Sequence, residues 1–106
     1  MAGGNFRLRV SDSYEVPLRG QVLRLKVVEG TPKAEDFGVG RKLRVRAPDG
    51  RESELRIMDH AITGGVFSQE RLDKTKEADI VVSREDARPN GEMIDIGWFV
   101  EGPVGS

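Results

Sequence analysis

The side chains of this chain that could do chemistry include one histidine with a neighbouring carboxylate. His60, the only histidine, directly follows Asp59. Such a pair could ligate a metal, or act as a general base with its orienting carboxylate. A metal site usually needs three or four ligands, and catalysis needs a nucleophile or substrate pocket as well. We therefore expect His60 to be an exposed or capping residue at a strand end. A small enzyme that uses His60 and Asp59 beside the loop at residues 63–66 is kept as an alternative.

A second group consists of basic residues that alternate with apolar ones along three segments. Its members are Arg24, Lys26, Arg44, Arg46 and Arg56. Alternate residues of a strand share one face, so we expect these cations on the polar faces of neighbouring strands, where they form a patch able to contact phosphates. The alternative is an ordinary solvated face whose arginines pair with Glu52 and Glu54. No aromatic residue is interleaved with the five cations, which weighs against sequence-tolerant binding of RNA.

Two adjacent aromatic residues, Trp98 and Phe99, predict an interface in the last strand. Neighbouring residues of a strand point to opposite faces, so one ring belongs to the core and the other is exposed. An exposed ring is covered by the ends of the chain or by a partner. A protein-interaction or structural domain, including a homodimer, is therefore a second hypothesis for the function.

The segments that must position these residues have the two-residue period of β-strands. In residues 20–28, Leu23, Leu25 and Val27 share one face. Residues 42–47 and 52–60 repeat the pattern, and Pro48-Asp49-Gly50 between them predicts a hairpin turn. Further strands are predicted at 6–10, at 78–83 and at 92–100, the last with Ile94, Ile96 and Trp98 on one face after an Asn90-Gly91 turn. Residues 68–78 predict no more than a helical turn or loop, with Ser68 as N-cap and Leu72 as the only large apolar residue.

Five or six short strands with little helix between them predict an all-β fold. We expect a small six-stranded antiparallel β-barrel, because closing a small sheet removes its exposed edges. The barrel is predicted to span residues 5–101, with loose termini at 1–4 and 102–106. A chain of 106 residues has the length of one such domain.

Composition narrows the function classes. The chain has no cysteine, which removes disulfides and thiolate chemistry and favours a reducing cytoplasm. No apolar run has the length of a membrane span, and the start lacks the apolar region of a signal peptide, so we expect no membrane association. The net charge of −1 is far from that of a dedicated nucleic-acid binder. Residues 1–56 nevertheless hold 12 Lys and Arg against 8 Asp and Glu, and residues 57–106 hold 5 against 10. Either the basic half meets an anionic partner or the two halves pair with each other.

Residues 20–36, GQVLRLKVVEGTPKAED, bring six residues into one ungapped pattern: Gly20, Val22, Val27, Gly30, Lys33 and Asp36. This pattern resembles the signature of the β-barrel that forms the second domain of translational GTPases such as elongation factor Tu. A second stretch, residues 71–83, is similar to the family at Leu72, Asp73, Asp79 and Val81. The resemblance covers about residues 14–83. It departs where the family has glycines and this chain has Leu25, Glu35 and Ala78.

The resemblance implies a binding module rather than a GTPase. The chain lacks the phosphate loop Gly-x-x-x-x-Gly-Lys-Ser/Thr, so we expect no nucleotide hydrolysis and no cofactor. In the family this barrel packs against the nucleotide domain and helps to hold the aminoacyl end of tRNA or touches ribosomal RNA. We therefore expect a non-enzymatic module that contacts RNA or a ribosome-associated protein through its basic strand faces.

Overall fold

The computed structural model describes residues 5–61 and 67–104. In chain order the described elements are β1 (Phe6–Val16), β2 (Gly20–Glu29), the short 3₁₀ helix η1 (Ala34–Phe37), β3 (Lys42–Arg46), β4 (Glu52–Arg56), β5 (Asp59–His60), α1 (Gln69–Thr75), β6 (Glu77–Val82), a second 3₁₀ helix η2 (Pro89–Gly91) and β7 (Phe99–Gly102). Of the loose ends predicted at 1–4 and 102–106, residues 1–4 and 105–106 lie outside the described residues, as does the loop at 63–66. None of the helices in the described ranges has the length and apolar character that crossing a bilayer demands.

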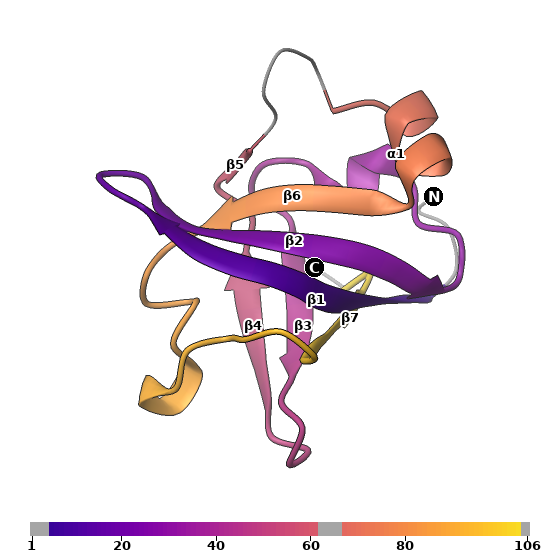
Figure 1. Ribbon diagram of the computed structural model, residues 1–106. Helices are drawn as coiled ribbons and strands as arrows, with labels where there is room; N and C mark the ends of the chain where they lie inside the picture. Colours follow the sequence, from indigo (N-terminus) through magenta and orange to yellow (C-terminus); the bar gives the residue numbers. More distant parts are fainter. Residues whose placement is uncertain (1–4, 62–66, 105–106) are drawn as a thin grey trace.

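The strands form one sheet in the order β4-β3-β7-β1-β2-β6-β5, and every pair in it is antiparallel. This arrangement confirms the predicted all-β, antiparallel fold. β3 and β4 run at a steep angle to β1, β2 and β6 (Figure 1). The last strand of the described chain, β7, lies between β3 and β1. It therefore joins the β3–β4 hairpin to the rest of the sheet.

The sheet has seven strands where the sequence predicted six, because the segment 52–60 divides into β4 and β5. Ile57 and Met58 separate the two strands. The N–H of Ile57 donates to the carbonyl of Arg41 at 2.9 Å, on the β3 side, whereas the N–H of Met58 donates to the carbonyl of Val81, in β6, at 2.8 Å. The chain thus changes its hydrogen-bonding partner within two residues, and the first and last strands of the sheet order are consecutive in sequence.

The inner face of the sheet carries the core that the two-residue period predicted. Leu23 and Leu25 in β2, Leu43 and Val45 in β3, and Leu55 in β4 are all buried. β1 adds Phe6, Leu8 and Val10, and β7 adds Val100. Phe37 from η1 and Leu72 from α1 belong to the same cluster of buried residues. α1 is a seven-residue helix, more than the helical turn or loop that the sequence predicted, with Leu72 as its one buried residue. Ser68 is its N-cap, as predicted, and accepts the N–H of Arg71.

Two glycines of the resemblance occupy positions where a side chain does not fit. Gly20 has φ +132°, and a Cβ there meets the carbonyl oxygen of Val82. Gly30 has φ +80°, and its Cβ falls 2.5 Å from the carbonyl oxygen of Asn5 and 2.8 Å from the Cα of Phe6. Both contacts are to backbone, which cannot move aside as a side chain can. These glycines therefore let β2 approach its neighbours closely at both ends.

Asp36 holds the connection that follows β2. Its side chain is buried, and Oδ2 accepts the N–H of Lys33 at 2.8 Å. The N–H of Asp36 in turn donates to the carbonyl of Lys33 at 2.9 Å. These two bonds fix the turn that delivers Phe37 into the core. The aspartate thus satisfies a backbone donor at the start of η1, as a capping residue does.

The predicted strand at 92–100 is wrong except at its last two residues. Asn90 and Gly91 lie in η2, the N–H of Ile94 donates to the carbonyl of Ala87 at 2.8 Å, and β7 begins only at Phe99. Gly97 has φ +96°, a conformation that interrupts a strand. Ile94 and Trp98 are buried as predicted, whereas Ile96 is exposed. β7 extends to Gly102, one residue past the predicted end of the domain at 101.

Candidate nucleic-acid interface

The outward face of the sheet carries its polar side chains in two rows that run across the strands. Residues paired directly across neighbouring strands share a face, so the register defines each row. The Phe99 row consists of Glu52 (β4), Arg46 (β3), Phe99 (β7), Arg9 (β1), Lys26 (β2) and Glu77 (β6). The Glu101 row consists of Glu54 (β4), Arg44 (β3), Glu101 (β7), Arg7 (β1) and Glu29 (β2).

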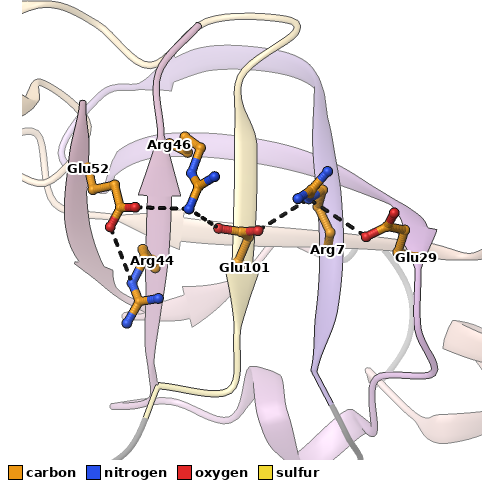
Figure 2. Close-up of polar contacts among 6 residues, drawn as sticks. All are labelled: Arg7, Glu29, Arg44, Arg46, Glu52 and Glu101. Carbon is orange, nitrogen blue, oxygen red and sulfur yellow. Dashed lines mark hydrogen bonds and ion pairs between the residues drawn. The ribbon is translucent and has the colours of Figure 1, made fainter. Parts of the chain in front are cut away.

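Most charges of the Glu101 row neutralise one another (Figure 2). Glu101 lies between two guanidinium groups, 3.2 Å from Nε of Arg7 and 3.3 Å from Nη2 of Arg46. Arg7 also approaches Glu29 at 3.8 Å. Glu52 of the neighbouring row pairs with Arg46 at 2.9 Å and with Arg44 at 3.8 Å. Exposed pairs of this kind contribute about 0–1 kcal/mol each, so the network aligns the side chains more than it stabilises the fold.

The centre of the Phe99 row is different, because it places an aromatic ring among cations. Phe99 is half-buried and points outward, with Arg46 opposite it on one side and Arg9 on the other. The guanidinium carbon of Arg7 lies 5.4 Å from the centre of the ring, within the range of a cation–π contact. The expectation that no aromatic residue accompanies the basic patch is therefore wrong. Phe99 is remote in sequence, and β7 brings it into the patch.

Arg9 and Lys26 form a like-charge pair beside this ring. They lie directly opposite each other on β1 and β2, and both are exposed. Within residues 5–61 and 67–104, neither makes an ion pair with a carboxylate. Like charges in directly opposite positions destabilise a sheet. Lys26 also faces Glu77 on β6, whereas Arg9 faces only Lys26 and Phe99. The pair therefore places two cations that make no ion pair in these ranges next to an aromatic surface.

The five cations predicted as one patch are divided between two parts of the sheet. β2, which carries Arg24 and Lys26, and β3, which carries Arg44 and Arg46, were expected to be neighbours, and this is wrong because β7 and β1 lie between them. Pairing across β7 and β1 is not visible in the local sequence pattern of either strand. The row that crosses these strands nevertheless brings Arg46 and Lys26 to the two sides of Phe99 and Arg9.

Arg24 and Arg56 lie away from the ring. Arg24 makes two hydrogen bonds to Asp79, at 3.2 and 3.3 Å, and this hydrogen-bonded carboxylate raises the pKa of the guanidinium. Arg56 is exposed on β4, opposite Lys42 of β3. Its N–H donates to the carboxylate of Asp86 at 2.9 Å. Lys42 and Arg56 are thus a second like-charge pair on the outer face, and Lys42 lies at the opposite end of β3 from Arg46, the residue that pairs with Phe99.

Trp98 and Phe99 divide between core and surface, as predicted for adjacent aromatics. Trp98 is only 5% exposed and packs in the core. Phe99 is the outward ring. Arg7 and Arg9, which complete its surroundings, were not singled out in the sequence. The signal was present, since Phe6, Leu8 and Val10 alternate with them along the predicted first strand.

The imidazole of His60 is held by a backbone carbonyl. Nε2 lies 2.6 Å from the oxygen of Phe37, and because a carbonyl only accepts, this nitrogen carries the proton. The ring also stacks on Phe67, with the ring centres 4.9 Å apart. The hydrogen bond of His60 therefore connects β5 to the last residue of η1. Among the described residues, no three His, Asp or Glu side chains are grouped so that they could hold a metal ion.

Asp59 does not orient the imidazole. Its Oδ1 accepts the backbone N–H of His60 at 2.8 Å, and its Oδ2 accepts from Nη2 of Arg19 at 2.8 Å. The backbone hydrogen bond from His60, together with the charge of Arg19, lowers the pKa of the Asp59 carboxyl. Both oxygens are therefore engaged away from the ring, which removes the general-base geometry that the pair of residues suggested.

Comparisons of the chain with family models, with curated proteins and with solved structures give no match.

Proposed function

We propose that this chain is a non-enzymatic binding module that holds RNA on the outer face of its sheet, at the centre of the Phe99 row. The observation that carries the proposal is the like-charge pair Arg9 and Lys26, which makes no ion pair within the described residues, beside the half-buried ring of Phe99. Cations that neutralise phosphates gain affinity by releasing counterions. An aromatic side chain gives bases a surface on which to stack. The two features occur together only at this part of the described outer face.

The electrostatics favour weak, salt-dependent binding. Arg46 is shared between Glu52 and Glu101, so its contribution to a phosphate is reduced. Arg9 and Lys26 have no ion pair to break within the described part of the chain, although Lys26 faces Glu77. For a single strand, each phosphate contact adds roughly −0.7 to the slope of the logarithm of the affinity against the logarithm of the salt concentration. Two contacts predict a slope of about −1.4. This is small, in keeping with a net charge of −1.

The direct test compares two double variants that remove equal charge from the same face. Arg9→Gln with Lys26→Gln removes the pair beside Phe99, and Lys42→Gln with Arg56→Gln removes the other like-charge pair. Binding of a fluorescent 12-nucleotide RNA is measured by anisotropy at about 50 mM salt and above. We expect the first variant to lose about tenfold in affinity and most of the salt slope, and the second to stay within about twofold of the unmodified protein. Equal losses in both variants, or no binding by the unmodified protein, overturn the proposal.

We also propose that the sheet closes into a barrel of the kind found in the second domain of translational GTPases. Support comes from the segment 52–60, whose two halves pair with opposite ends of the strand order through Ile57 and Met58. Gly20, Gly30 and Asp36, which belong to the resembling stretch, hold positions that the backbone requires. This relationship favours RNA or a ribosome-associated protein as partner, and the cytoplasm as location. Amide exchange tests the closure: Met58 and Ala61 should be protected as fully as Leu55, and rapid exchange at either contradicts it.

A second candidate function is protein docking, favoured by one observation. Leu18, at the tip of the β1–β2 hairpin, is 101% exposed with φ +67°. With the half-exposed Met58 it lines an open hollow of about 380 Å³. Exposed apolar groups of this kind mark interaction sites when they gather in a patch. If a homodimer forms here, sedimentation shows a mass that rises with concentration and a Leu18→Gln variant that stays monomeric. A monomer at all concentrations removes the homodimer.

A further inference from the structure

The proposed RNA site has a geometry that selects the form of its ligand. Adjacent strands lie about 4.8 Å apart, so the row from Arg46 through Phe99 and Arg9 to Lys26 spans roughly 14 Å across four strands. The ring of Phe99 lies between the cations rather than at the edge of the row. A ligand that contacts the cations on both sides must therefore pass over the ring.

We propose, building on the proposed function, that the ligand is an unpaired stretch of nucleic acid, with one base stacked on Phe99 and the adjoining phosphate on Arg9 and Lys26. In a duplex the faces of the bases are covered by their neighbours, and the grooves are read by a helix, a narrow two-stranded ribbon or long side chains. The outer face here is a broad sheet in which six strands contribute to the two rows. Its recessed ring can meet a base face only where that base is unstacked.

The side chain of Arg7, which lies over the ring of Phe99, can be displaced by a ligand. Arg7 lies above Phe99 and is held from the side by Glu101 and Glu29 (Figure 2). An exposed ion pair of this kind favours the paired position of a side chain by an equilibrium factor of about five at most. Stacking of one base on an aromatic ring raises the affinity by roughly 5- to 150-fold. The base therefore displaces the guanidinium or is sandwiched beneath it. Either way Arg7 keeps its contact with Glu101 or turns to a phosphate.

The two sides of the ring are unequal. On the β3 side Arg46 is already paired with Glu52 and Glu101. On the β1–β2 side the repulsion between Arg9 and Lys26 is relieved when a phosphate settles between them. The stronger phosphate contact thus belongs to the β1–β2 side of the stacked base. A ring and cations offer features common to all nucleotides, so binding tolerates different sequences.

The experiment uses a 12-nucleotide RNA of mixed sequence, the same sequence as a 12-base-pair duplex, and the corresponding single-stranded DNA. The variants are Phe99→Leu, which keeps apolar bulk without a ring, and Phe99→Trp, which restores a stacking surface. Tyr14→Leu is the matched control, because Tyr14 is also an exposed aromatic of the sheet but lies outside both rows. Circular dichroism establishes that each variant is folded.

We expect the single-stranded RNA to bind at least about tenfold more tightly than the duplex. Phe99→Leu should lower that affinity by about 5- to 100-fold and leave duplex binding unchanged, while Phe99→Trp and Tyr14→Leu stay within about threefold. If single-stranded RNA and single-stranded DNA bind similarly, the stacked base can come from either nucleic acid. If the RNA binds more tightly than the DNA, the ligand is RNA. Equal binding of strand and duplex with no effect of Phe99→Leu overturns the inference; if Arg9→Gln with Lys26→Gln still reduces binding, the proposed function stands without it. Absence of all binding overturns both.

Discussion

Arg9 and Lys26 lie directly opposite each other on β1 and β2, two exposed cations in one register pair. The arrangement costs stability, and neither side chain makes an ion pair or a side-chain hydrogen bond within the described residues. A sheet selected for stability alone would place a carboxylate at one of the two positions, as it does for Arg46 and Glu52. The pair therefore lowers the stability of this face, and its two charges are explained by the proposed binding of RNA.

Removing the repulsion should stabilise the protein while weakening RNA binding. Arg9→Gln is expected to raise the free energy of unfolding by about 0.2–1 kcal/mol, because like charges opposite each other are destabilising by about that amount and the variant leaves Lys26 opposite Glu77. The gain should shrink in about 1 M salt, which screens the repulsion. Urea unfolding at low and high salt measures both quantities. A variant that is less stable than the unmodified protein would show that the side chain of Arg9 has a partner after all.

Substituting Gly30 should be far more costly than substituting Gly50. Both have positive φ, +80° and +92°, but a Cβ at Gly30 falls 2.5 Å from the carbonyl oxygen of Asn5, whereas Gly50 has open space around it. We expect Gly50→Ala to cost about 1 kcal/mol from backbone strain and Gly30→Ala to cost about 3 kcal/mol or more, since β1 must move away. Thermal unfolding of the two variants measures the difference. Equal losses would mean that β1 and the end of β2 are not in close contact.

The backbone conformation of Leu18 is unfavourable for a leucine. The N–H of Arg19 donates to the carbonyl of Val16 at 3.1 Å, closing a turn in which Pro17 is followed by Leu18 at φ +67°. Glycine or asparagine suits that conformation, and leucine is strained there. Leu18→Asn should raise the free energy of unfolding by about 0.5–1 kcal/mol, because an exposed side chain loses no packing. Leu18→Ala keeps the strain and is the control; a similar gain in both variants contradicts the explanation.

The carboxyl of Asp59 should make a small contribution to stability that disappears in acid. Its pKa is lowered in the folded state, first by the hydrogen bond from the N–H of His60 and also by Arg19. A lowered folded pKa means that the contribution is complete above the unfolded value of about 3.9 and is lost as the pH falls through the lower folded value. Because the side chain is 58% exposed, we expect less than about 1 kcal/mol. Asp59→Asn should be less stable than the unmodified protein at pH 7 and equal to it near pH 2; a gap that persists at pH 2 points to a cause other than charge.

The strands whose inner face is apolar could be predicted from the sequence. Leu43 and Val45 alternate with arginines, and Pro48-Asp49-Gly50 turns the chain into β4, with the N–H of Gly50 donating to the carbonyl of Ala47. The second half of β1 could not be predicted in this way. Ser11, Asp12 and Ser13 have no apolar alternation, and the register shifts between Val10 and Asp12. Pairing with β2 imposes the extended conformation there.

The candidate site depends on information that is not local. Each strand's outward residues follow from its own alternation, but their neighbours follow from strand order. Phe99 joins Arg46 and Arg9 only because β7 enters between β3 and β1. Likewise, the period-two pattern of Ile94, Ile96 and Trp98 predicted a strand, yet Gly97 at φ +96° and the hydrogen bonds of the loop decided the conformation. Local patterns identify faces, and tertiary pairing assembles the site.

The pairing of Phe6 with Gly102 across β1 and β7 has a consequence for how the unit could be carried by other proteins. The first and last strands of the unit end side by side, so the whole unit can be inserted into a surface loop of another protein. The chain of that protein then continues from almost the same point. Such a graft needs only short connecting segments and leaves the arginine-lined face open to its surroundings.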